Sequence, residues 1–131
     1  MAKNKIVLCD SNIIIDIING VAPINNILAN LDETIAISII TEIEIIIGAL
    51  NKEMQQNLIK KLKYYNVVQI DEKISVLACD LIKNYRLSNG LDIPDAFIAA
   101  TSIVYEIPLY TNNIKDFKFI KGIELFNQSS H

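Results

Sequence analysis

Short apolar runs alternate along the chain with longer segments whose apolar residues recur every three or four positions. Runs of this kind are typical of buried strands, and we expect strands at residues 6–9, 34–39, 67–70, 108–110 and 123–126. The periodic segments predict helices at residues 13–18, 23–31, 41–50, 52–65, 72–87 and 95–105. With no internal repeat or linker to divide it, the sequence predicts a single domain, residues 1–131, with its core at about residues 5–126.

Strands that alternate with helices predict βαβ crossovers, and these place the strands side by side and parallel. We therefore expect an α/β fold, a three-layer α/β/α sandwich with a mostly parallel central sheet. Ligands of such folds bind outside the carboxyl ends of the strands. That edge of the sheet is where functional residues should gather.

Composition narrows the possible chemistry. The chain is 51% hydrophobic and 21% charged, as expected for a folded domain of 131 residues, and it contains a single histidine, His131. Because this histidine is the last residue, a Ser-His-Asp triad, an HExxH zinc site or a two-histidine ribonuclease mechanism is excluded. An enzyme built on this sequence must rely on carboxylates, with or without a metal ion.

Charge and cysteine usage give weaker indications about partners and compartment. A net charge of −3 argues against coating nucleic acid through bulk positive charge, but a divalent cation can neutralise acids and phosphates locally. Cys9 and Cys79 are far apart and form no C-x-x-C motif, which is typical of reduced thiols in the cytosol. No apolar run reaches the ~18 residues of a spanning helix, and the run near the N-terminus is too short for a signal peptide. We expect a cytoplasmic protein without a membrane segment.

Four acidic residues fall at the predicted carboxyl edge of the sheet. They follow the first strand, lie one turn into the helix after the second, open the central helix and follow the fourth strand: Asp10, Glu44, Asp95 and Asp116. Carboxylates in one place repel one another unless a cation intervenes, and no Lys or Arg is adjacent in sequence to the first three. Oxygen ligands without protein cations suit Mg²⁺ or Mn²⁺.

Each acid also has a purely structural interpretation. Asp10 could cap the helix that follows it, and Thr41-x-x-Glu44 fits a capping box. Asp95 could stabilise the positive end of a helix macrodipole, and Asp116 could be a solvated loop acid. These alternatives stay open residue by residue, but they do not predict that the four acids share one location.

The acids belong to four motifs, at residues 10–12, 41–49, 93–101 and 109–117. In order, they read Asp-Ser-Asn after a strand, Thr-x-x-Glu-x-x-x-Gly-Ala, Ile-Pro-Asp-Ala-Phe-Ile-Ala-Ala-Thr, and Leu-Tyr-Thr-Asn-Asn-x-x-Asp-Phe. Together they resemble the PIN-domain nucleases, in particular the VapC-type toxins of toxin–antitoxin pairs, over about residues 5–126. The resemblance implies a flavodoxin-like α/β/α fold, Mg²⁺-dependent RNA cleavage and a cognate antitoxin that blocks the site.

The resemblance also implies roles for individual residues. Asp10, Glu44 and Asp95 match three acids of the family and Asp116 its more variable fourth, so these four are the expected catalytic and metal-binding residues. A second set of polar positions in the same motifs is expected to support them: Ser11, Asn12, Thr111 and Asn113. Ser11 stands where threonine is more usual in the family, and Asp92 is a possible accessory acid that matches no motif position.

The resulting hypothesis is a Mg²⁺-dependent endoribonuclease, with Mn²⁺ able to substitute, that hydrolyses RNA phosphodiester bonds with metal-activated water. The alternative is a weakly active or inactive PIN domain that binds RNA or protein. A phosphoaspartate receiver is disfavoured because residues 51–66 contain a single acid, Glu53, and a haloacid-dehalogenase-type phosphatase because Asn12 stands where a second aspartate is needed.

The expected partners are the RNA substrate, a cognate antitoxin and a second copy of the chain in a homodimer. The predicted helical segments at residues 13–18 and 45–50 carry more apolar residues than one core face needs. That excess predicts an antitoxin groove or a dimer seam. Burial within the monomer is the equally open alternative.

Overall fold

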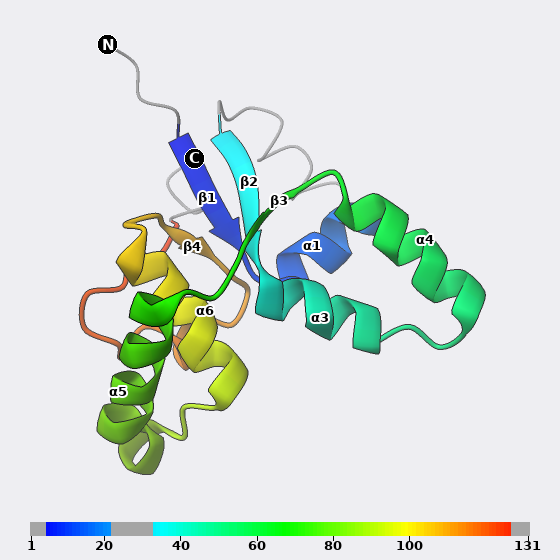
Figure 1. Ribbon diagram of the computed structural model, residues 1–131. Helices are drawn as coiled ribbons and strands as arrows, with labels where there is room; N and C mark the ends of the chain where they lie inside the picture. Colours follow the sequence, from blue (N-terminus) through cyan, green and yellow to red (C-terminus); the bar gives the residue numbers. More distant parts are fainter. Residues whose placement is uncertain (1–4, 22–32, 127–131) are drawn as a thin grey trace.

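The computed structural model describes residues 5–21 and 33–126 (Figure 1). Its strands are β1 (Lys5–Cys9), β2 (Glu33–Ser38), β3 (Asn66–Val68) and β4 (Leu109–Tyr110). Its helices are α1 (Ser11–Ile18), α3 (Ile39–Ile47), α4 (Lys52–Leu62), α5 (Glu72–Asn89) and α6 (Ile93–Val104), with a 3-10 turn η1 (Ile114–Asp116). The helix predicted at residues 23–31 lies outside the described residues.

The four strands form one sheet in the order β3-β2-β1-β4, and every strand pair is parallel. In the centre, Leu8 of β1 is opposite Ala36 of β2 on one side and Leu109 of β4 on the other. The strand predicted at residues 123–126 is reduced to a single parallel bridge between Leu109 and Leu125. At this bridge the Leu109 N–H donates to the Glu124 carbonyl and the Phe126 N–H donates to the Leu109 carbonyl, both at 2.8 Å.

Helices cover both faces of the sheet, because successive residues of each strand point to opposite sides. Leu8 packs in the core formed with α5 and α6, whereas its neighbour Val7 packs in the core formed with α1, α3 and α4. Figure 1 shows α5 and α6 on one side of the sheet and α1 and α4 on the other. The predicted three-layer α/β/α sandwich is confirmed.

Helix α6 is the central helix that its nearly uniform apolar composition predicts. Ala96, Ile98, Ala99 and Ala100 are buried within it. The chain reaches α6 through a left-handed turn at Gly90, with φ of 72°, where the Gly90 N–H donates to the Arg86 carbonyl and ends α5. The same turn places the first residues of α6 at the carboxyl edge of the sheet.

The start of α3 differs from the prediction. Ser38 caps the helix by accepting a hydrogen bond from the Ile40 N–H at 3.1 Å, so α3 begins at Ile39 and the capping box proposed for Thr41 and Glu44 is wrong. The sequence predicted a later start of the helix because Ile39 and Ile40 continue the β-branched pattern of the preceding strand. Glu44 therefore lies in the second turn of α3, away from the helix start.

None of the helices in the described part of the chain is long and apolar enough to cross a membrane.

Candidate active site

Asp10 lies where β1 ends and α1 begins, and it is 4% exposed. Its Oδ1 accepts from the Ser11 N–H at 2.8 Å, which makes Asp10 the N-cap of α1 as the structural interpretation predicted. Its Oδ2 accepts from the Thr111 hydroxyl at 2.8 Å and from the Asn12 amide at 3.3 Å. A helix cap needs only the first of these bonds, so the other two hold the buried carboxylate in one orientation.

The loop after β4 lies against α1 through side-chain hydrogen bonds. The Asn113 N–H donates to the Thr111 hydroxyl oxygen at 3.0 Å, and the Asn112 N–H donates to Asn12 Oδ1 at 3.1 Å. The Asn112 side-chain amide donates to Asp16 Oδ2 at 3.3 Å. The predicted supporting residues Asn12, Thr111 and Asn113 are thus in one network with Asp10, and the structure adds Asn112 and Asp16 to it.

Asp95 stands in the first turn of α6, where the helix macrodipole would lower the pKa of a carboxyl group. The opposite happens: the pKa of Asp95 is raised from 3.8 to about 7. Burial is the largest cause, followed by the negative charges of Asp10, Asp116, Glu44 and Asp92. Desolvation and like charges therefore outweigh the dipole, and the four predicted acids lie within electrostatic reach of one another.

Glu44 and Asp116 complete this group from two other segments. Glu44 is partly buried on α3, and burial together with the charge of Asp10 raises its pKa. Asp116 is exposed at the end of η1 and adds its charge to the surroundings of Asp95. Within the described part of the chain, no side-chain hydrogen bond reaches Glu44 or Asp95, in contrast to Asp10.

The chemistry of this donor set suits a hard divalent cation, although the side chains do not form a closed cage. Among the described residues the only ion pair joins Arg86 to Asp92 at 2.7 Å, so no protein cation pairs with the four acids. In the same part of the chain, no three His, Cys, Asp or Glu side chains are grouped closely enough to hold an ion on their own. Mg²⁺ keeps several of its waters and takes few protein carboxylates, so the acids fit a hydrated ion held partly through water.

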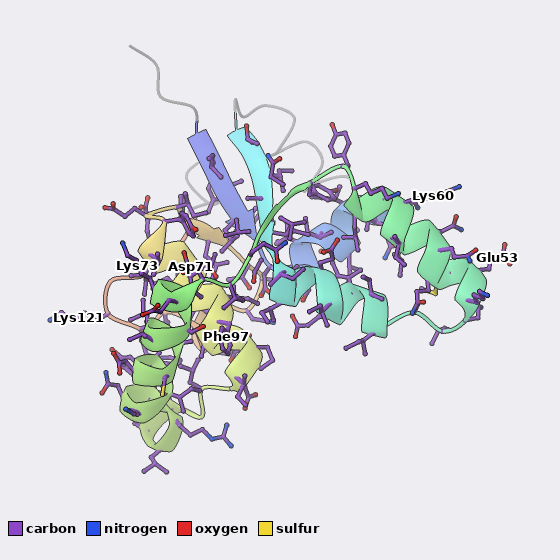
Figure 2. The ribbon with its side chains drawn as sticks, viewed as in Figure 1. Glu53, Lys60, Asp71, Lys73, Phe97 and Lys121 are labelled. Atoms are coloured by element: carbon purple, nitrogen blue, oxygen red, sulfur yellow. The ribbon has the colours of Figure 1, made fainter. Side chains whose placement is uncertain are left out.

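Two of the lysines lie far from one another, at opposite ends of the molecule. Figure 2 shows Lys60 pointing outward from α4 and Lys121 pointing outward on the opposite side. Both lie on exposed parts of the chain. This arrangement is typical of solvated lysines, and among the described residues neither of these two lysines forms an ion pair with one of the four acids.

An apolar pocket of about 270 Å³ lies beside Glu44, between α1, α3 and α4. Its lining includes Ile15, Ile18, Ile45, Met54 and Leu58. Ile15 on α1 is 42% exposed and Ile47 on α3 is 75% exposed, so part of the apolar excess predicted for residues 13–18 and 45–50 faces outward. Of the alternatives that the sequence left open, complete burial within the monomer is not observed.

A family model described as the PIN domain matches residues 7–121, which include all four acids. The chain belongs to the PIN domain family. Its similarity to individual members points to the VapC type. It is 34% identical over 98 residues to ribonuclease VapC1 of Methanocaldococcus jannaschii, with 71% of each chain covered. It is 29% identical over 121 residues to ribonuclease VapC10 of Mycobacterium tuberculosis, with 90% of each covered.

Solved structures agree with this assignment across nearly the whole PIN domain. A toxin–antitoxin complex from Klebsiella pneumoniae contains a chain that is 31% identical, with a TM-score of 0.76 and coverage of 93% of this chain and 97% of that one. VapBC2 of Rickettsia felis, solved bound to a DNA fragment from its promoter, is 30% identical with a TM-score of 0.79 and coverage of 93% and 98%. The predicted membership in the VapC-type PIN domains is confirmed.

Proposed function

We propose that this VapC-type PIN domain is the ribonuclease toxin of a toxin–antitoxin pair and that it hydrolyses RNA with Mg²⁺, for which Mn²⁺ can substitute. The observation that carries the proposal is the gathering of Asp10, Glu44, Asp95 and Asp116 at the carboxyl edge of a parallel sheet. Within the described residues no cation of the protein compensates these charges. The curated relatives named as ribonucleases support the reaction class.

In this proposal Asp10, Glu44 and Asp95 hold the ion directly or through water, and Asp116 contributes from the edge of the site. The metal supplies a bound water of lowered pKa and positive charge against the phosphate. Thr111 and Asn12 keep the buried carboxylate of Asp10 oriented through their hydrogen bonds. Because burial and the neighbouring negative charges raise the pKa of Asp95 to about 7, its carboxyl group binds a proton more readily in the metal-free protein, and that proton must leave when the cation binds.

The reaction is hydrolysis of a phosphodiester bond. The oxygen of water forms a bond to phosphorus and the bond to the 3′ oxygen breaks, which leaves 5′-phosphate and 3′-hydroxyl ends. This route uses neither a protein nucleophile nor histidine, in agreement with the residues that the chain offers.

A cognate antitoxin is the expected protein partner. The pocket between α1, α3 and α4 is apolar and borders Glu44, so an antitoxin segment seated there would reach the edge of the site. The similar chains from Klebsiella pneumoniae and Rickettsia felis, in structures of a toxin–antitoxin complex and of VapBC2, support such a partner. A homodimer and a cytoplasmic location stay predictions.

Cleavage of defined RNAs by the purified protein tests the proposal. We expect Mg²⁺ or Mn²⁺ to support cleavage, EDTA to stop it, and Asp95→Asn to be inactive under both metals. Mapping of the ends should give 5′-phosphates. Activity that survives chelation would contradict the metal mechanism, and metal-independent RNA binding without cleavage would favour the alternative of an inactive PIN domain.

A further inference from the structure

A ladder of side-chain hydrogen bonds, here called the α1–loop ladder, joins α1 to the loop after β4. It runs from Asp16 through Asn112 and Asn12 to Asp10 and Thr111. We propose that Asp16 and Asn112 are positioning residues that act through Asn12 to fix which oxygen of Asp10 faces the site. This inference rests on the proposed function, since it assigns a role to residues behind one of its acids.

Asn12 is the central residue of the ladder, because both the nitrogen and the oxygen of its side-chain amide form hydrogen bonds. Its Nδ2 donates to Asp10 Oδ2 at 3.3 Å, and its Oδ1 accepts from the Asn112 backbone N–H at 3.1 Å. A flipped amide would place its oxygen against the carboxylate and its NH₂ group against a backbone donor. The position of the Asn112 backbone therefore dictates the orientation of the group that contacts Asp10.

Asp16 holds Asn112 in that position. Its Oδ2 accepts from the side-chain amide of Asn112 at 3.3 Å, and Asn112 is otherwise on the exposed part of the loop. Because Asn12 and Asp16 are four residues apart on α1, they lie on the same face of the helix. Asn12 and Asp16 on α1 thus bind Asn112 through its backbone N–H and through its side-chain amide, respectively.

The consequence is an asymmetric Asp10 carboxylate. Its Oδ2 accepts two hydrogen bonds, from Thr111 and Asn12, whereas its Oδ1 accepts one, from the Ser11 N–H. A carboxylate oxygen has two lone pairs, so within the described residues Oδ1 keeps one acceptor position and Oδ2 keeps none. The ladder therefore presents Oδ1 to an incoming cation, and loss of its Asn12 contact leaves Oδ2 with the Thr111 hydrogen bond alone.

Variants that cut the ladder far from Asp10 test this role. Asp16→Ala and Asn112→Ala each remove the same side-chain bond, Asp16→Asn keeps an acceptor oxygen, and Asp80→Ala on the exposed part of α5 is the matched control. Each is assayed for kcat and KM with Mn²⁺, for Mn²⁺ affinity and for thermal melting. The amide NMR signals of Asn12 and Asn112 are recorded without metal.

We expect Asp16→Ala to lower kcat and Mn²⁺ affinity about tenfold, the low end of the range for a direct outer partner of a metal ligand, because Asp16 acts on Asp10 through Asn112 and Asn12, and we expect KM for RNA to stay within about twofold. Asn112→Ala should match it, the double variant should lose no more than either single one, and Asp16→Asn should recover most of the loss. The Asn12 side-chain amide signals should shift in Asp16→Ala and stay in place in Asp80→Ala. A uniform loss of melting temperature would not produce this pattern.

Two results would overturn the inference. The first is wild-type kcat and Mn²⁺ affinity in Asp16→Ala, and the second is unchanged Asn12 amide signals in that variant. Failure of the proposed function looks different, because the wild-type protein would then neither cleave RNA nor bind Mn²⁺. In that case the amide signals of the metal-free protein still decide whether Asp16 positions Asn12.

Discussion

Asp10 and Asp95 are two carboxylates of one candidate site, held in opposite ways. Asp10 is buried and accepts three hydrogen bonds from Ser11, Asn12 and Thr111. Asp95 is partly buried, receives no side-chain hydrogen bond from the described residues, and has its pKa raised to about 7. Hydrogen bonds from the fold therefore fix the Asp10 carboxylate. The Asp95 carboxylate is held by its position on α6, although burial and the neighbouring negative charges disfavour its charged form.

The difference indicates which parts of the site exist before a cation arrives. Because three hydrogen bonds hold the Asp10 carboxylate, we expect its orientation to be the same with and without a metal ion. Asp95 and Glu44 are destabilised in their charged forms by burial and by neighbouring carboxylates, and binding of a cation or a proton relieves this unfavourable energy. Removing the charge of Asp10 should therefore lower the stability of the fold, and removing the charge of Asp95 should raise it, although either change should abolish activity.

The largest expected effect tests that contrast directly. Asp10→Asn and Asp95→Asn should each lower RNA cleavage by at least about 100-fold, because each removes a charged ligand of the proposed metal ion. In EDTA, Asp95→Asn should melt several degrees above wild type because it removes a repelled charge. Asp10→Asn should melt below wild type because an NH₂ group replaces an oxygen that accepts hydrogen bonds.

Thermal melting of both variants and of Asp80→Asn in EDTA measures the comparison, and the control should stay close to wild type. If Asp10→Asn and Asp95→Asn both melt at a higher temperature than wild type, the hydrogen bonds of Asp10 do not outweigh the repulsion between the acids. The proposed difference between Asp10 and Asp95 would then be wrong.

The pH dependence of stability gives the next effect. Because the pKa of Asp95 is raised in the folded protein from 3.8 to about 7, the folded state binds this proton more tightly than the unfolded chain. As far as Asp95 is concerned, the free energy of unfolding in EDTA is highest below about pH 4, falls between pH 4 and 7 and is level above pH 7. At about 1.4 kcal/mol for each pKa unit, a fully buried group would lose about 4.5 kcal/mol, and because Asp95 is only partly buried, solvent screening reduces the expected fall to the order of 2–4 kcal/mol.

Urea unfolding across this pH range measures the effect, with Asp95→Asn as the matched variant. We expect the fall to be much smaller in Asp95→Asn and also when Mg²⁺ replaces EDTA. An equal fall in wild type and in Asp95→Asn would assign it to other groups.

The smallest expected effect concerns Arg86, whose ion pair with Asp92 borders the site. Its side chain is 55% exposed and that of Asp92 is 69% exposed, so water screens the pair. We expect Arg86→Met to change the free energy of unfolding by less than about 1 kcal/mol. Chemical denaturation checks this value. A loss above 2 kcal/mol would mean that Arg86, which also donates to the Gly90 and Leu91 carbonyls, holds the start of α6, and with it Asp95, in place.

Much of the fold could be predicted because the apolar pattern and the final structure agree at the strands and long helices. The run at residues 6–9 becomes β1, and the periodic segment at residues 72–87 becomes α5, which runs two residues further to Asn89. The start of α3 could not be predicted, because Ile39 and Ile40 suit a strand by propensity and the helix begins there only because Ser38 caps it. Within the described residues, the strand predicted at residues 123–126 is present only as the bridge between Leu109 and Leu125, because its pairing depends on a distant part of the chain that the local apolar pattern does not specify.

The candidate site was predictable to a similar degree. Asp10, Glu44, Asp95 and Asp116 could be predicted together because the carboxyl ends of parallel strands share an edge. Their roles as ligands stay predictions. Asp16 and Asn112 were missed because their hydrogen bond joins residues 96 positions apart, and only the four-residue spacing of Asn12 and Asp16 pointed toward it.

The pairing of β1 with β4 also bears on when during synthesis the site can exist. Asp10 directly follows β1, yet the hydroxyl that orients its carboxylate belongs to Thr111, 101 residues later. Contacts this distant in sequence form late in folding, after the chain between them has closed a long loop. A nascent or prematurely terminated chain that ends before β4 carries three of the four acids but lacks the partner that fixes the first. Nuclease competence should therefore arise only with the finished fold, when released protein can also meet its antitoxin.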